Sequence, residues 1–147
     1  MMQNGYFENM VKTASPLQMV IMLYDRAIAN LRTARELMLA GEQSPEALRE
    51  KLEALGKAAD IIAWLDGTLN FEKGGQIAQN LHQIYDTLLH ELVKVSAKDD
   101  PEVVGKMIGI LENLREAWRD AEKDLRKQKA KAPEETNARA GKVAASF

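Results

Sequence analysis

The 147-residue chain contains no cysteine, only four prolines, and only 5% aromatic residues. Without cysteine it can form no disulfide bonds, no thiolate metal sites and no cysteine nucleophile. A chain without thiols also suits a reducing compartment. We therefore expect a cytoplasmic protein.

Long hydrophobic runs are also missing. The longest stretch without a charged residue covers residues 13–24, which is 12 residues and includes Ser15 and Pro16. That is too short for a membrane-spanning helix. The N-terminus does not combine a basic flank, an apolar run and a small-residue cleavage site, so we expect no secretory signal. Neither feature predicts a membrane partner.

Charge of one sign is not in large excess. The chain has 20 Lys and Arg residues against 22 Asp and Glu residues, which gives a formal net charge of -2. Such a balance creates no field that calls for nucleic acid or an anionic membrane. The charges are unevenly spread, because residues 126–147 carry six basic and two acidic side chains. We interpret this as an acidic body followed by a basic, solvated tail.

Helix signals, by contrast, are abundant. Ser15-Pro16, Ser44-Pro45 and Asp100-Pro101 each place a side-chain oxygen before a proline that can occupy the first helical position. Gln18 completes a capping box with Ser15. Gly41 is suited to the left-handed conformation that ends a helix. We predict helices over about residues 16–40, 45–69, 76–98 and 101–129.

Apolar residues recur at helical spacing in all four segments. The predicted inward stripes are Leu17, Val20, Ile21, Tyr24, Ala27, Ile28, Leu31, Ala34 and Met38; Leu48, Leu52, Leu55, Ala59, Ile62 and Leu69; Ile77, Leu81, Ile84, Leu88, Leu92 and Val95; and Val104, Met107, Leu111, Leu114, Trp118, Ala121 and Leu125. Asp66 interrupts the second stripe, beside Leu65. Helices of similar length with short connections predict an all-α, antiparallel, up-down-up-down four-helix bundle over residues 15–129. Residues 130–147 lack periodicity and are expected to be a disordered tail.

The sequence gives little support for a catalytic or cofactor-binding site. In a di-iron bundle each histidine would follow a glutamate by three residues, but His82 and His90 follow Gln79 and Thr87. The two histidines are interpreted as residues at the solvent edge. Zinc, phosphate-loop and dinucleotide motifs are absent. Four carboxylates near apolar faces are interpreted as caps or ion-pair partners rather than as an acid and a base: Asp25, Asp60, Asp66 and Asp86. We expect no enzyme activity and no cofactor.

Two helices carry more apolar surface than one core needs. Residues 19–23 read MVIML, and on the second helix Ile61 and Trp64 flank the inward stripe. A wide core or a homodimer seam would use this surface. The alternative is a groove for a partner segment, since apolar patches with polar rims mark such sites.

The segment before the first helix is also rich in apolar residues but cannot form a core of its own. It contains Tyr6, Phe7, Met10 and Val11. Residues 1–14 are therefore interpreted as a lid segment that can cover the groove when no partner is bound.

Seven stretches together resemble the FliS family of flagellar secretion chaperones, over about residues 4–120. They are NGY at 4–6, VKTASP at 11–16, MLYDRAI at 22–28, LNFEKGGQIAQNL at 69–81, IYD at 84–86, DP at 100–101 and LREAW at 114–118. In one position the chain departs from the family pattern, because Arg26 stands where the family usually has glycine.

The resemblance implies an all-helical cytoplasmic bundle without enzymatic activity or cofactor. Members of that family hold the disordered C-terminal segment of flagellin, prevent its premature polymerisation and keep it ready for flagellar type III export. In them the N-terminal segment folds over the hydrophobic site. Components of the export gate or a co-chaperone are further candidate partners, and a monomer or weak homodimer is expected.

The resulting site prediction combines the lid with the apolar faces. The lid residues are Tyr6, Phe7, Met10 and Val11, and the groove residues are Met22, Ile61, Leu65 and Leu81. Two other functions remain open from the sequence: a helical homodimeric adaptor, and a regulator that binds another amphipathic segment, such as an anti-sigma factor.

Overall fold

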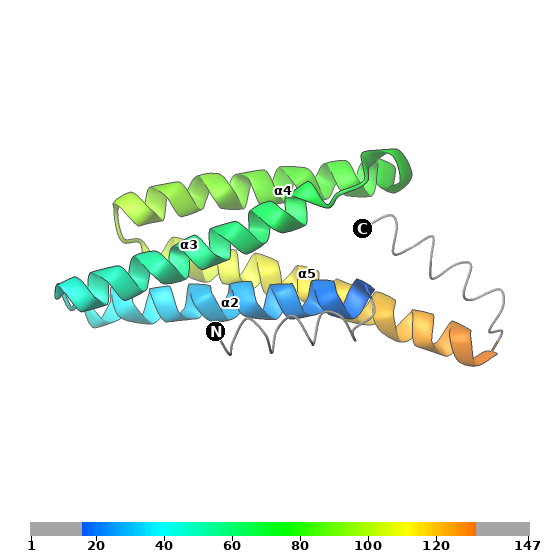
Figure 1. Cartoon of the computed structure of the whole chain (residues 1–147), viewed down its shortest axis with the longest axis horizontal. Helices are drawn as coiled ribbons and strands as arrows, with labels where there is room; N and C mark the ends of the chain where they lie inside the picture. The colour runs from blue at the N-terminus through cyan, green and yellow to red at the C-terminus, as the bar shows by residue number, and fades with distance from the viewer. Residues whose placement is uncertain (1–15, 132–147) are drawn as a thin grey trace, which may run out of the picture.

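The computed structural model describes residues 16–131, which form four α-helices and no strand. Helix α2 spans Pro16–Ala40, α3 spans Pro45–Gly67, α4 spans Phe71–Ala97 and α5 spans Pro101–Lys131. Successive helices run in opposite directions along one long axis (Figure 1). The predicted up-down-up-down bundle is confirmed. The predicted lid and the part of the tail after residue 131 lie outside the described residues.

Helix ends follow the predicted cap chemistry. The Ser44 hydroxyl accepts a hydrogen bond from the Ala47 N–H at 3.1 Å, with Pro45 at the first helical position of α3. The Asp100 carboxylate accepts from the Val103 N–H at 3.2 Å at the start of α5. Gly41 has a φ of 69°, the left-handed conformation expected after α2. Ser15, the predicted cap of α2, lies outside the described residues.

Helix α4 begins earlier than its apolar pattern predicts. The Asn70 side chain accepts from the Lys73 N–H at 3.0 Å and caps a first turn that starts at Phe71. Gly75 then interrupts the helix with a φ of 52° and a ψ of -126°. Such a conformation is open to glycine and strained for other residues. The predicted start near residue 76 therefore marks the resumption of the helix after this break.

The core runs between the four helices and contains most of the predicted inward residues. Its largest fully buried side chains are Tyr24, Tyr85, Leu17, Ile28, Leu31, Leu55, Ile62, Leu88, Leu111 and Val104. The hydroxyls of Tyr24 on α2 and Tyr85 on α4 form a buried hydrogen bond of 2.6 Å. The Trp118 ring of α5 packs against Tyr24 with a centroid distance of 6.5 Å. These three aromatic residues connect α2, α4 and α5.

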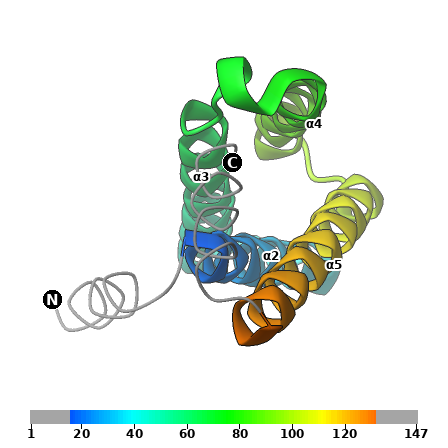
Figure 2. The same ribbon diagram turned by 90° about the vertical axis from the view of Figure 1, so that its right-hand side faces the viewer.

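Three residues of the predicted stripes are exposed instead. Leu48 and Leu52 are 49% and 42% exposed, because the first turns of α3 lie beside α2 and away from α4 (Figures 1 and 2). Ile77 is 61% exposed, just after the break in α4. The inward assignment of these residues is wrong, since helical spacing identifies a face without showing how far the next helix covers it.

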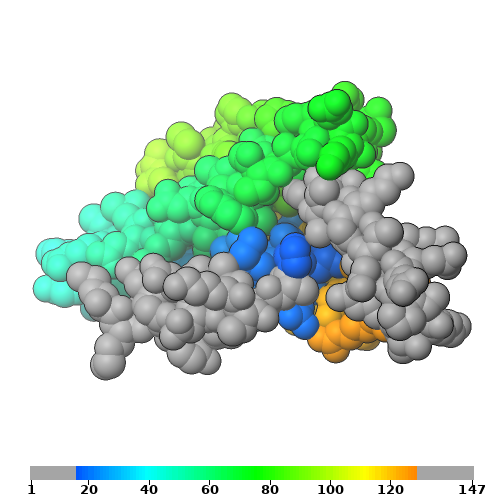
Figure 3. Space-filling model, turned by 45° about the vertical axis from the view of Figure 1, so that its right-hand side comes forward, coloured from blue at the N-terminus to red at the C-terminus, as the bar shows by residue number. Residues whose placement is uncertain are grey.

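The four helices are not equally packed. Helix α2 packs closely against α3 and α5, whereas α4 packs mainly against α3 and makes few contacts with α5, its other neighbour in the bundle. Figures 2 and 3 show the start of α4 and the end of α5 on opposite sides of the molecule. The seam between α4 and α5 is therefore the most open part of the bundle. Among the described helices, none is long and apolar enough to cross a membrane.

Candidate functional site

The predicted groove residues do not form one surface in this structure. Leu65 and Leu81 are buried in the core, with 2% and 6% of their surface exposed. Ile61 is partly buried and packs against the same core. Met22 lies in a separate shallow pocket between α2 and α5. The predicted lid residues are outside the described part of the chain.

The open seam between α4 and α5 holds an apolar cavity of about 430 Å³. Ile84 and Leu88 of α4 and Ile110 of α5 supply its apolar lining, and Ile110 is 40% exposed. Polar but uncharged side chains complete the lining: Asn80, Gln83 and Thr87. The seam can hold an apolar segment and offer amide groups to its backbone.

Ile110 is a seam residue that the sequence prediction missed. It lies one helical turn before Leu114, a partly buried residue of the predicted stripe, and therefore on the same side of α5. This spacing was the available signal. It was missed because Met107 and Leu111, one residue away on the helix surface, form a stronger stripe.

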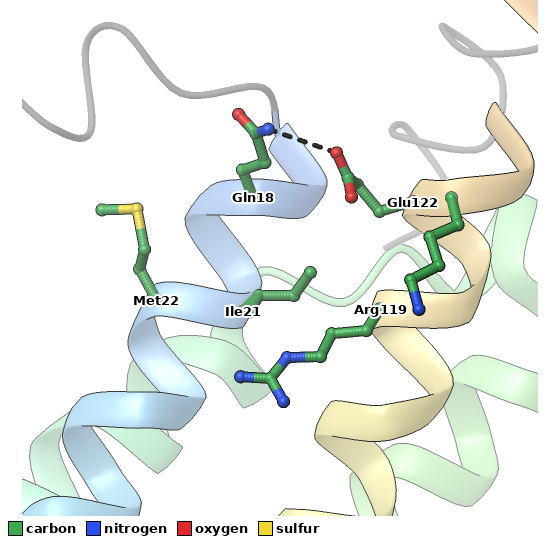
Figure 4. A pocket seen from close by; sticks show the side chains of 6 residues that line it. Gln18, Ile21, Met22, Arg119 and Glu122 are labelled. Carbon is green, nitrogen blue, oxygen red and sulfur yellow. Dashed lines mark hydrogen bonds between the residues drawn. The ribbon is translucent and has the colours of Figure 1, made fainter. Parts of the chain in front are cut away.

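The pocket that contains Met22 has a volume of about 390 Å³ and lies between the first turns of α2 and the second half of α5 (Figure 4). Ile21 and Met22 line it from α2, and Arg119 and Lys123 line it from α5. Glu122 also lines the pocket and accepts a hydrogen bond of 3.2 Å from the Gln18 amide. The pocket therefore combines an apolar part with cationic side chains.

A third cavity, of about 420 Å³, is polar, and both of its arginines have partners within the protein. Arg32 forms an ion pair of 2.8 Å with Glu112, and the Arg35 Nε donates to the Pro101 carbonyl at 3.1 Å. A Cβ added to Gly105 would lie 3.3 Å from the Arg35 Nε. The glycine thus leaves room for Arg35 to cross α5, and this cavity serves the packing of α2 on α5.

Asp25 takes part in an ion pair, as predicted. Its carboxylate lies 2.9 Å from the Arg115 guanidinium and 3.6 Å from that of Arg119. Both arginines belong to α5, so the three side chains tie α5 to α2. The position of Arg26, where the family pattern has glycine, is exposed and its carbonyl accepts a hydrogen bond of 2.9 Å from the Asn30 amide.

His82 has a specific partner, although the sequence suggested no role for it. Its Nδ1 lies 2.7 Å from the Asp66 carboxylate, which joins α3 to α4. This hydrogen bond raises the pKa of His82 above its usual 6.5, and the charge of Asp86 adds to the effect. The Phe71 ring meets His82 edge-on at a centroid distance of 5.8 Å. Asp66, which interrupts the apolar stripe, therefore fastens the α3–α4 connection.

Within residues 16–131, no group of three or more histidine and carboxylate side chains is arranged to hold a metal ion. Burial raises the pKa of both Tyr24 and Tyr85, whose hydroxyls form a hydrogen bond with each other in the core. What this part of the chain does present is shallow apolar cavities between helices. These are suited to binding a segment of another protein.

Comparison with known proteins identifies relatives of the chain. The sequence model of the family described as flagellar protein FliS matches residues 1–125. The flagellar secretion chaperone FliS of Salmonella typhimurium is 37% identical over 113 residues, which cover 76% of this chain and 80% of that protein. The flagellar secretion chaperone FliS of Vibrio cholerae is 35% identical over 111 residues, covering 76% and 78%. That of Bacillus subtilis is 28% identical over 125 residues, covering 85% and 89%.

Proposed function

This chain belongs to the FliS family of flagellar secretion chaperones, and from that premise we propose that it binds the C-terminal segment of flagellin in an apolar groove of the bundle. In this proposal the bound segment is held in the cytoplasm, where it cannot polymerise, until the flagellar type III export apparatus takes it. The chaperone identity of the relatives supports a binding role rather than a catalytic one.

The open seam between α4 and α5 is the structural feature that best supports this proposal. Helix α4 packs mainly against α3, and its α5-facing side leaves Ile84 partly exposed opposite Ile110. Ile77 lies seven residues before Ile84 and therefore on the same side of the helix. An amphipathic helix of the client, placed in the seam, would contact α4 and α5 together.

The energy available from this surface suits a reversible complex. Full burial of an isoleucine contributes about 1.5–3 kcal/mol. Ile77 and Ile110 are 61% and 40% exposed, so covering each contributes on the order of 1 kcal/mol. Folding of a disordered client on binding costs about 2–5 kcal/mol. Several such contacts are therefore needed, and the complex stays weak enough to be handed over.

The remaining predicted residues enter the proposal in different ways. Residues 1–14 would cover the groove in the free state through the four apolar lid residues: Tyr6, Phe7, Met10 and Val11. Ile61 is partly buried on α3 and would contact the client directly, whereas Met22 lines the separate pocket between α2 and α5 and is not part of the seam. Leu65 and Leu81 are buried, so they would reach the client only if the bundle opened.

The first test compares two charged substitutions of exposed aliphatic residues. Ile110→Glu places a carboxylate in the seam and is expected to weaken binding to flagellin at least about tenfold, because an unpaired charge would be buried in the complex. Val93→Glu is the matched control, since Val93 is 72% exposed on α4 and does not line the seam. The readout is the dissociation constant by calorimetry, with circular dichroism to show that both variants fold. Equal affinity of the two variants would place the client elsewhere.

The second test changes the client. Flagellin without its C-terminal segment should no longer co-purify with the chain, whereas full-length flagellin should. Undiminished binding to truncated flagellin would contradict the proposal. Sedimentation at several protein concentrations separates a homodimeric adaptor from a chaperone, because a lidded chaperone should stay largely monomeric.

The third test concerns the lid. Deletion of residues 1–12 should leave the bundle folded, increase the binding of an apolar dye and speed association with flagellin. A cooperative loss of helicity on deletion would show instead that these residues belong to the core.

A further inference from the structure

The cation-rimmed pocket between α2 and α5 is not accounted for by the proposed client groove. We propose that this pocket binds a second partner, an acidic amphipathic helix that inserts an apolar side chain between carboxylates spaced one helical turn apart. This α2–α5 pocket is formed by Gln18, Ile21, Met22, Arg119, Glu122 and Lys123.

The apolar part of the pocket comes from the surplus run on α2. Met19, Val20, Ile21 and Met22 all remain partly exposed, while Leu23 of the same run is buried in the core. Ile21 and Met22 line the α2–α5 pocket (Figure 4). Methionine side chains adapt to differently shaped apolar partners. The run MVIML thus serves two purposes, since one part fills the core and another lines an open surface.

The cations of the pocket retain capacity for a partner. Arg119 is 43% exposed in its side chain and is only the more distant partner of Asp25, at 3.6 Å, because Arg115 holds that carboxylate at 2.9 Å. Lys123 is exposed and has no ion pair among the described residues. The one carboxylate of the pocket, Glu122, is already paired with Arg126.

The spacing of these cations indicates the shape of the partner. Arg119 and Lys123 are four residues apart on α5, so their side chains lie one above the other along the helix. Carboxylates four residues apart on a partner helix have the same spacing. An apolar residue between them would lie over Ile21 and Met22. Charge complementarity therefore favours an acidic amphipathic helix over a basic or neutral one.

The α2–α5 pocket and the client seam lie on different edges of α5. Ile110 contacts the seam from the edge that faces α4, whereas Arg119 lies on the edge that faces α2 and its Asp25. A partner in the pocket does not occupy the surface proposed for flagellin. The chain can therefore bind both partners at once, and the second site stands even if the client groove is elsewhere.

The test uses the full chain with labelled isoleucine and methionine methyl groups, observed by NMR. The probe is a synthetic alanine-based helical peptide with one central leucine and glutamates placed so that two of them, four residues apart, flank it. It should shift the Ile21 and Met22 methyl signals in a saturable, salt-sensitive manner and leave Ile84 and Ile110 unchanged. The same peptide with lysines in place of glutamates should bind at least about tenfold more weakly.

A double variant then distinguishes binding at the α2–α5 pocket from non-specific electrostatic attraction. Arg119→Glu with Lys123→Glu should weaken binding of the acidic peptide at least about tenfold. Lys57→Glu, a charge reversal at an exposed lysine of α3, should leave it within about twofold. The proposal is overturned if the acidic peptide shifts neither methyl, if it shifts the seam residues instead, or if the two variants behave alike. Saturating flagellin should leave the peptide affinity unchanged, and competition between them would show that there is one shared site.

Discussion

The buried tyrosine pair supports a quantitative prediction about hydrogen bonding in the core. Tyr24 and Tyr85 are 0% and 1% exposed, and their hydroxyls lie 2.6 Å apart. Removing one hydroxyl leaves the other without its partner and without water. Such a group costs about 1–3 kcal/mol, whereas removing both partners costs much less. The two single substitutions should therefore not be additive.

The perturbation is the cycle Tyr24→Phe, Tyr85→Phe and the double variant. Each single variant should lower the free energy of unfolding by about 1–3 kcal/mol. The double variant should lose no more than the worse single variant, which gives a coupling energy of about 1–3 kcal/mol.

The assay is urea denaturation followed by circular dichroism at 222 nm, with the slope of the transition compared among variants. An unchanged slope shows that the unfolding transition still exposes the same surface. If the two single losses add to the double loss within about 0.5 kcal/mol, the hydroxyls do not act as a pair. The explanation by an unsatisfied buried hydroxyl would then be refuted.

Two further predictions concern the connection between α3 and α4. Gly75→Ala should lower the free energy of unfolding by about 1–3 kcal/mol, because alanine is strained at a φ of 52°. Gly56→Ala should raise the free energy of unfolding by about 0.5–1 kcal/mol, since Gly56 lies inside α3 and an added Cβ meets no atom within 4 Å. Equal effects of the two substitutions in urea denaturation would contradict this prediction. Asp66 raises the pKa of His82 in the folded protein. The His82–Asp66 pair therefore stabilises the fold fully below the pKa of histidine in the unfolded chain, about 6.5, and this stabilisation is lost as pH rises through the higher pKa of the folded protein. The melting temperature should therefore fall less between pH 6 and pH 8 in His82→Gln than in the wild type or in His90→Gln, and identical profiles would exclude the pair as the cause.

The sequence predicted the architecture well because its signals are local. Ser44 and Asp100 cap their helices as predicted, and Gly41 adopts the expected left-handed conformation. The early start of α4 was missed, since Asn70 and Gly75 act together to place a capped turn before the main helix. Local patterns identify each of these residues but do not show that the turn continues into a helix.

The candidate site was less accessible to sequence analysis. Met22 was correctly recognised as part of a surplus apolar surface, but its neighbours are Arg119 and Lys123 of a distant helix. Leu65 and Leu81 were predicted to face a groove and are buried. Which of two adjacent apolar stripes is covered depends on how far neighbouring helices diverge. That distance depends on tertiary packing, and the apolar periodicity of a single helix does not indicate it.

The weak packing of α4 against α5 also has a consequence for folding and local opening. Helix α2 packs closely against both α3 and α5, while α4 depends mainly on α3. Helix α4 is thus the element whose detachment loses the fewest contacts, and its amides should exchange with solvent by a local opening of lower free energy than global unfolding. A segment bound in the seam would give α4 a second neighbour and slow that exchange. Hydrogen exchange along α4 would then report client binding from within the bundle itself.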